Sequence, residues 1–76
     1  MNKNGQINAI AWSPDGKHIV SGASDKTAQV WEAATGKQVL TYDGHSSDVT
    51  AVAWSPDSTR VASGGRGDNA QIWTAQ

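Results

Sequence analysis

The residue types that could carry chemistry in this 76-residue sequence gather around one histidine. His45 lies between Asp43 and Asp48, and on paper it could join Ser63 and Asp68 as a Ser-His-Asp set. A metal site is not predicted, because no third nitrogen and no thiolate ligand accompanies the carboxylates. Catalysis is not predicted either, because no nucleophile-elbow glycine pattern or helix terminus is available to stabilise an oxyanion. We therefore expect no catalytic residues, no metal, no cofactor and no enzymatic activity.

Two other features could be taken for binding motifs. The tripeptide at 66–68, Arg-Gly-Asp, occurs in cell-adhesion ligands, but here it is more simply explained as a β-turn. Trp12 and Trp54 could stack on a ligand. Their equivalent positions in an internal repeat favour packing between structural units instead, and we expect this role for both.

Composition narrows the class of protein further. The chain has no cysteine, which excludes a disulfide framework and a thiolate zinc site. Six basic and seven acidic residues give a net charge of −1, and their scattered placement predicts neither nucleic-acid nor membrane binding. The apolar runs are too short for a membrane span or a signal peptide, so a soluble, cytoplasmic protein is expected. Only eleven residues are Ile, Val or Leu, which predicts burial against other copies of the chain.

The sequence repeats itself with a period of 42 residues. Residues 1–34 align with 43–76, and twelve of these 34 pairs are identical. The identities include Ala-Trp-Ser-Pro-Asp at 11–15 and 53–57, together with Ser-Gly at 21–22 and 63–64. Trp, Gly and Ser-Pro-Asp turn motifs that recur at this period are typical of stacked β units rather than helical arrays.

Alternating apolar residues and turn residues divide each copy into short strands. Two prolines, eight glycines and many β-branched residues oppose helix formation. The first and third strands of each copy are apolar on both faces, with small residues on one face and large ones on the other. This pattern is typical of a sheet pressed between two similar sheets. The expected strands are 7–12, 17–23, 27–32, 37–43, 49–54, 60–65 and 69–73, which makes four strands and then three.

These motifs together resemble the WD-repeat β-propeller family. The resemblance rests on Gly-His at 44–45, Ser-Pro-Asp in both first hairpins, Ser-Gly in both second strands, and Trp31 and Trp73 in the third strands. It implies an all-β fold of antiparallel four-stranded blades around a channel. It also implies a rigid platform for other proteins, without an obligatory cofactor.

The family often has a buried hydrogen-bond chain that joins a His, a Ser or Thr, an Asp and the third-strand Trp. The first repeat has Lys3 in place of the His, and the second has Gly67 at the Asp position, with Asp68 one residue later. By resemblance, the members of this structural chain are Ser21, Asp25, Trp31, His45, Ser63, Asp68 and Trp73.

The resemblance also predicts how the chain is divided and what it does. Residues 1–6 form an N-terminal extension, residues 7–43 the first blade, and residues 44–76 a second blade without its outer strand. Two blades cannot close a ring, so we expect self-association into a homotetramer of eight blades, with a trimer of six blades as the alternative. The expected function is a self-assembling scaffold for protein–protein interaction. The alternative is an engineered or excised propeller fragment whose only activity is homo-oligomerisation.

Overall fold

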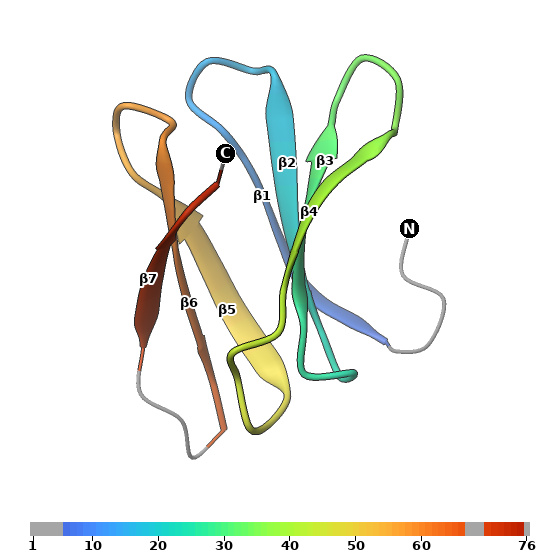
Figure 1. Cartoon of the computed structure of the whole chain (residues 1–76), viewed down its shortest axis with the longest axis vertical. Helices are drawn as coiled ribbons and strands as arrows, with labels where there is room; N and C mark the ends of the chain where they lie inside the picture. Colours follow the sequence, from blue (N-terminus) through green and yellow to red (C-terminus); the bar gives the residue numbers. More distant parts are fainter. Residues whose placement is uncertain (1–5, 67–69, 76) are drawn as a thin grey trace.

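Seven β-strands form two antiparallel sheets in the computed structural model, which describes residues 6–66 and 70–75 (Figure 1). Sheet 1 has the strand order β1-β2-β3-β4, and sheet 2 has the order β5-β6-β7. The all-β fold predicted from the sequence is confirmed. The strands are β1 (Ile7–Trp12), β2 (His18–Ala23), β3 (Ala28–Glu32), β4 (Gln38–Tyr42), β5 (Val49–Trp54), β6 (Arg60–Gly65) and β7 (Gln71–Thr74).

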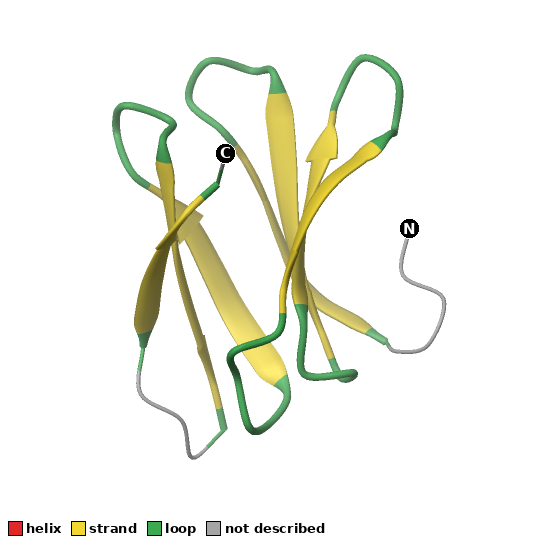
Figure 2. Cartoon of the chain, viewed as in Figure 1, coloured by secondary structure: helices red, strands yellow, loops and turns green. Residues whose placement is uncertain are grey.

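The observed strands begin and end within two residues of the predicted ranges. Figure 2 shows short turns and loops between consecutive strands from β1 to β6. In the described residues there is no helix that could cross a membrane.

The hairpin turn after β1 is held by its own side chains. Ser13 Oγ donates to Asp15 Oδ1 at 2.5 Å and accepts a hydrogen bond from the His18 backbone N–H at 3.0 Å. The turn ends with Gly16 at a φ of 74°, and the equivalent turn after β5 places Ser58 at a φ of 64°. Glycine adopts this left-handed conformation without strain, whereas serine does not. Ser58 therefore needs a compensating contact.

A β-bulge interrupts the first strand of each sheet. The register shifts between Ile7 and Ala9 in β1 and at the equivalent place in β5. A bulge adds one residue to one strand and so changes which side chains share a face. In β5 it brings Val49 and Val52 to the same face, where both lie against Gly22 of sheet 1.

The hydrophobic core lies between the two sheets. Strand β5 packs along β1 and β2, so that sheet 2 covers one face of sheet 1. A Cβ atom added to Gly22 would lie only 2.5 Å from Val49 Cγ1 and 3.2 Å from Val52 Cγ1, so this close approach requires glycine. The buried members of the central cluster are Val20, Ala28, Val30, Val61, Trp73 and Ala75.

Candidate functional site

The first predicted hydrogen-bond set is partly assembled within sheet 1. Trp31 Nε1 donates to Ser21 Oγ at 3.1 Å, and both side chains are buried. Asp25, predicted to join this set, accepts hydrogen bonds from the backbone N–H of Thr27 at 3.1 Å and from its hydroxyl at 2.6 Å. These bonds place the Asp25 carboxylate in its own turn between β2 and β3.

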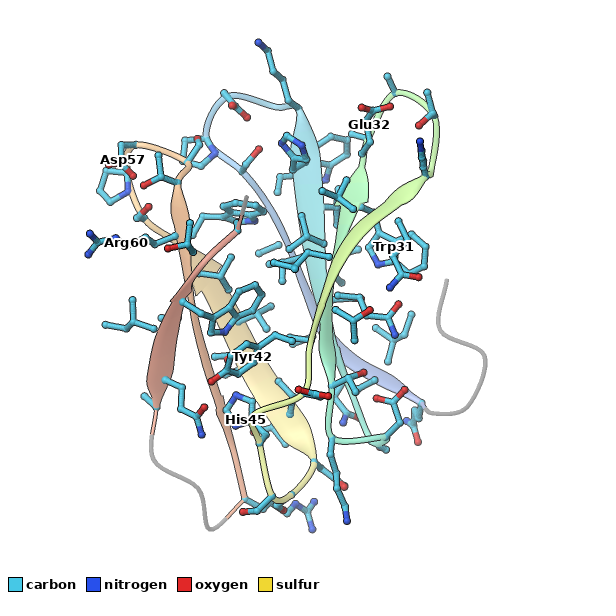
Figure 3. All side chains as sticks on the ribbon, in the orientation of Figure 1. Trp31, Glu32, Tyr42, His45, Asp57 and Arg60 are labelled. Carbon is cyan, nitrogen blue, oxygen red and sulfur yellow. The ribbon has the colours of Figure 1, made fainter. Side chains whose placement is uncertain are left out.

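The second set is more extensive and joins a loop to two strands. Ser63 Oγ accepts a hydrogen bond from Trp73 Nε1 at 2.8 Å and lies 2.6 Å from His45 Nε2. Tyr42 stacks on Trp73 with a centroid separation of 4.7 Å and meets the His45 ring edge-on at 5.7 Å (Figure 3). Asp68, the remaining predicted member, lies outside the described residues.

This second set has the wrong surroundings for nucleophilic catalysis. A nucleophilic serine needs an accessible hydroxyl next to its base. Ser63 is 2% exposed, and its Oγ already accepts the Trp73 indole N–H. His45 is buried beside it, under the Tyr42 ring. The arrangement is suited to fixing the loop before β5 onto sheet 2.

Ionised carboxylates stabilise the two Ser-Pro-Asp turns. The Ser55 hydroxyl, then the hydroxyl and backbone N–H of Thr59, donate to Asp57 and lower its pKa to about 2. The Ser13 hydroxyl lowers the pKa of Asp15 in the same way. Hydrogen bonds to the charged form of a carboxylate favour that form, so both carboxylates stay ionised and hydrogen-bonded at neutral pH.

The two predicted packing tryptophans have different environments. Trp54 packs between the sheets, where its Nε1 donates to the Ala11 carbonyl at 3.0 Å and its ring lies 6.3 Å from the His18 ring. Trp12, at the equivalent position in sheet 1, is 60% exposed. The difference arises because sheet 1 lies against Trp54, whereas the side of sheet 1 that carries Trp12 faces away from sheet 2.

Each sheet therefore has an exposed apolar face. We call the outer side of sheet 1, with Ile7, Ile10 and Trp12, the Trp12 face; these side chains are 38%, 56% and 60% exposed. The outer side of sheet 2 is the Gly64 face, which carries Ala53, Arg60, Ala62, Gly64, Ala70 and Ile72, and Ile72 is 71% exposed. Pockets of about 310 Å³ and about 230 Å³ lie on the Gly64 face. The sequence pattern of small residues on one face of the strands predicted such a side, and the structure shows that in sheet 2 it is the outer one.

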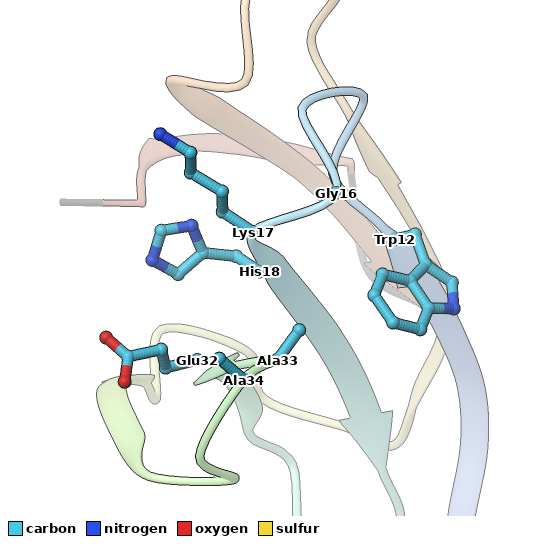
Figure 4. Close-up of a pocket in the computed structure, with 7 residues that line it drawn as sticks. All are labelled: Trp12, Gly16, Lys17, His18, Glu32, Ala33 and Ala34. Atoms are coloured by element: carbon cyan, nitrogen blue, oxygen red, sulfur yellow. The ribbon is translucent and has the colours of Figure 1, made fainter.

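A larger pocket of about 460 Å³ lies at one end of sheet 1 (Figure 4). Lys17, His18 and Glu32 line it together with Trp12. Figure 4 shows Trp12 across β2 from the His18 and Glu32 side chains, so these groups do not converge on one point. Among residues 6–66 and 70–75, no group of three or more His, Asp or Glu side chains is placed to hold a metal ion.

Comparison with known proteins gives a consistent result over nearly the whole chain. Residues 2–32 and 36–74 match the family model described as WD domain, G-beta repeat. An uncharacterised WD repeat-containing protein of Nostoc sp. is 49% identical over 43 residues, which cover 57% of this chain and 3% of that protein. The general transcriptional corepressor TUP1 of Saccharomyces cerevisiae is 35% identical over 43 residues, which cover 57% of this chain and 6% of that protein.

The whole chain also superposes on solved structures. It matches the structure of U3-55K with a TM-score of 0.91 and 30% identity, covering 100% of this chain and 25% of that one. It matches the crystal structure of the RRP9 WD40 repeats with a TM-score of 0.90 and 31% identity, covering 100% of this chain and 24% of that one. The chain therefore spans about a quarter of these structures and a much smaller share of the curated relatives.

Proposed function

Because this chain belongs to the WD-repeat family of β-propellers, we propose that it is a non-catalytic scaffold for protein–protein interaction that assembles with copies of itself. The observation that carries the proposal is the pair of exposed apolar faces on two sheets whose inner faces already pack together. Trp12 and Ile72, the most exposed large apolar side chains, lie on opposite outer sides of the molecule. Exposed apolar surface of this kind marks an interaction site.

The two outer faces differ from each other, so the association is head-to-tail. A head-to-tail contact closes a ring only when the rotation from one copy to the next divides the circle. Each chain supplies two sheets, so four chains give a ring of eight blades, and three chains give six. We propose the four-chain ring, with the three-chain ring as the alternative.

The ring would then present its hairpin turns as rims to other proteins. The turns that contain Asp15 and Asp57 lie at one end of the sheets, and their carboxylates are ionised and hydrogen-bonded. Preorganised turns on a rigid support are suited to binding a partner, because little conformational freedom is lost on binding. The name of the related yeast protein, a transcriptional corepressor, is consistent with a role exerted through other proteins.

Size-exclusion chromatography with multi-angle light scattering, over a range of protein concentrations, tests the self-assembly. The expected mass at high concentration is four times the 8.0 kDa of one chain, and it should fall on dilution. Three times the chain mass would establish the smaller ring. A folded 8.0 kDa species with β-sheet circular dichroism at every concentration would contradict the proposal.

A further inference from the structure

We propose that the Trp12 face of one copy docks on the Gly64 face of a second copy and repeats the contact that already joins sheet 1 to sheet 2 within the chain. This inference rests on the proposed self-assembly and specifies its contact surface. In it, Trp12 of one copy enters the pocket beside Arg60 of the other.

The contact between the two sheets of one chain is the template. Trp54 of sheet 2 donates to the Ala11 carbonyl of sheet 1 at 3.0 Å and packs near the His18 ring. Adding 42 to Ala11 and His18 gives Ala53 and Arg60, and subtracting 42 from Trp54 gives Trp12. The residues named here therefore have counterparts on the two outer faces.

The counterpart of the Trp54 site is vacant and has a suitable shape. The pocket of about 310 Å³ on sheet 2 is lined by Ala53, Arg60, Ala62 and Ile72, among others. In this pocket the Ala53 carbonyl is the counterpart of the Ala11 carbonyl, which accepts the Trp54 indole N–H in the inner contact. Arg60 replaces His18 and can lie against the indole of Trp12, where a guanidinium is attracted to the ring face.

Gly64 provides a second, independent match. Its counterpart Gly22 is covered by Val49 and Val52, which approach the position of an added Cβ to 2.5 and 3.2 Å. A Cβ added to Gly64 would meet only the Ala70 backbone, at 3.9 Å. The space that valines fill over Gly22 is thus open over Gly64. The counterparts of those valines are Ile7 and Ile10, two of the three side chains that define the Trp12 face.

Four of the side chains that differ between the two contacts nearly compensate in volume, with a net gain of one carbon. Relative to the inner contact, Val49 and Val52 become Ile7 and Ile10, which adds one methylene each. On the opposite face Val20 becomes Ala62, which removes two carbons, and Val30 becomes Ile72, which adds one. Volume-conserving exchanges of this kind are the ones that a packed apolar contact tolerates.

The same comparison excludes a symmetric contact. Two Trp12 faces would place large side chains against large ones, and two Gly64 faces would leave the pockets of both copies unfilled. Close packing is reached only when large residues meet the small-residue face. The contact is therefore head-to-tail.

Disulfide trapping tests the contact, because the chain has no cysteine. In the inner contact, a Cβ at Gly22 lies 3.1 Å from Val49 Cβ, close to the 3.5–4.5 Å typical of disulfides. The equivalent pair between copies is Ile7 and Gly64. The variants Ile7→Cys and Gly64→Cys, each carrying a different mass tag, are purified separately, mixed and oxidised.

The expected product is the mixed dimer, formed in large excess over either homodimer. Homodimers as abundant as the mixed dimer would overturn the head-to-tail contact. Assembly by light scattering without mixed cross-linking would overturn this contact and leave the proposed self-assembly standing. A monomer by light scattering would remove both proposals.

A second variant guards against cysteine-specific effects. Gly64→Val has room within its own sheet, so the circular dichroism should stay that of the unmodified chain. It should weaken association about tenfold or more, because the added methyl groups occupy the space needed by the partner's Ile7 and Ile10. Unchanged association of this folded variant would overturn the proposal.

Discussion

Replacing Ser63 with alanine should destabilise the fold more than the same replacement of Ser21. The two serines are equivalent in the repeat, both are buried, and each accepts a tryptophan indole N–H, at 2.8 Å for Ser63 and 3.1 Å for Ser21. Among the described residues, only Ser63 has a second partner, His45 Nε2 at 2.6 Å. The chain thus contains its own matched control for the histidine–serine hydrogen bond.

The size of the difference follows from the groups left without a partner. A buried polar group that loses its hydrogen bond costs about 1–3 kcal/mol. Ser21→Ala affects one such group, the Trp31 indole N–H. Ser63→Ala affects two, the Trp73 indole N–H and the His45 ring nitrogen. Because His45 has other interactions, we expect the extra loss at Ser63 to be at the lower end, about 1–2 kcal/mol.

Urea unfolding followed by far-ultraviolet circular dichroism measures both losses. All variants are compared at one protein concentration, because association would shift the transition. A double-mutant cycle with His45→Ala isolates the pair, and the histidine change should cost less once Ser63 is absent. Equal free-energy losses for Ser21→Ala and Ser63→Ala, together with additive effects in the cycle, would refute the role given to this hydrogen bond.

Three further results are expected. In the inner contact, the Ser58 hydroxyl accepts a hydrogen bond from the Asp15 backbone N–H at 3.2 Å. Gly16→Ser places an equivalent hydroxyl at the contact between copies, so it should strengthen association by about 0.5–1.5 kcal/mol, as measured by analytical ultracentrifugation. Thr59→Val should raise the pKa of Asp57 from about 2 towards 3.8, as followed by carboxyl NMR. Because the folded-state pKa lies below the unfolded one, the stability due to this turn is present above pH 3.8 and is lost as the pH falls towards 2. Trp12→Ala should abolish association at concentrations where the unmodified chain assembles, while light scattering of the variant gives the chain mass of 8.0 kDa.

Strand positions and turns could be predicted from the sequence because their causes are local. Ser13 and Asp15 hold the first hairpin through hydrogen bonds that span at most five residues, and the same motif recurs after β5. The pairing of tryptophan with serine is implied by the resemblance to the family, and positions 21 and 31 lie in neighbouring antiparallel strands. Asp25 lies in the turn after β2, as the resemblance implies, and the hydroxyl and N–H of Thr27 donate to its carboxylate.

The sequence predicts small residues on one face of the strands and large ones on the other, but not the detailed fit of the outer faces. That fit depends on how closely the two sheets approach each other, which is fixed at Gly22 by the side chains of Val49 and Val52. The sequence marks position 22 and its counterpart at position 64 only as Ser-Gly pairs. The different environments of Trp12 and Trp54 have the same origin, since both have identical sequence neighbours at 11–15 and 53–57.

A chain that contains one whole copy of a contact and most of the two surfaces of a second copy should assemble cooperatively. Each added chain in an open row forms one new contact between copies and loses the freedom of one chain. The step that closes the ring forms a further contact without immobilising another chain, so it proceeds at a high effective concentration. The contact between copies lacks the Ser58 hydroxyl of the inner contact, because Gly16 stands at the equivalent position, so open rows should be weakly held. The closed ring should therefore coexist mainly with single chains, and dissociation on dilution should pass between these two species without populated intermediates.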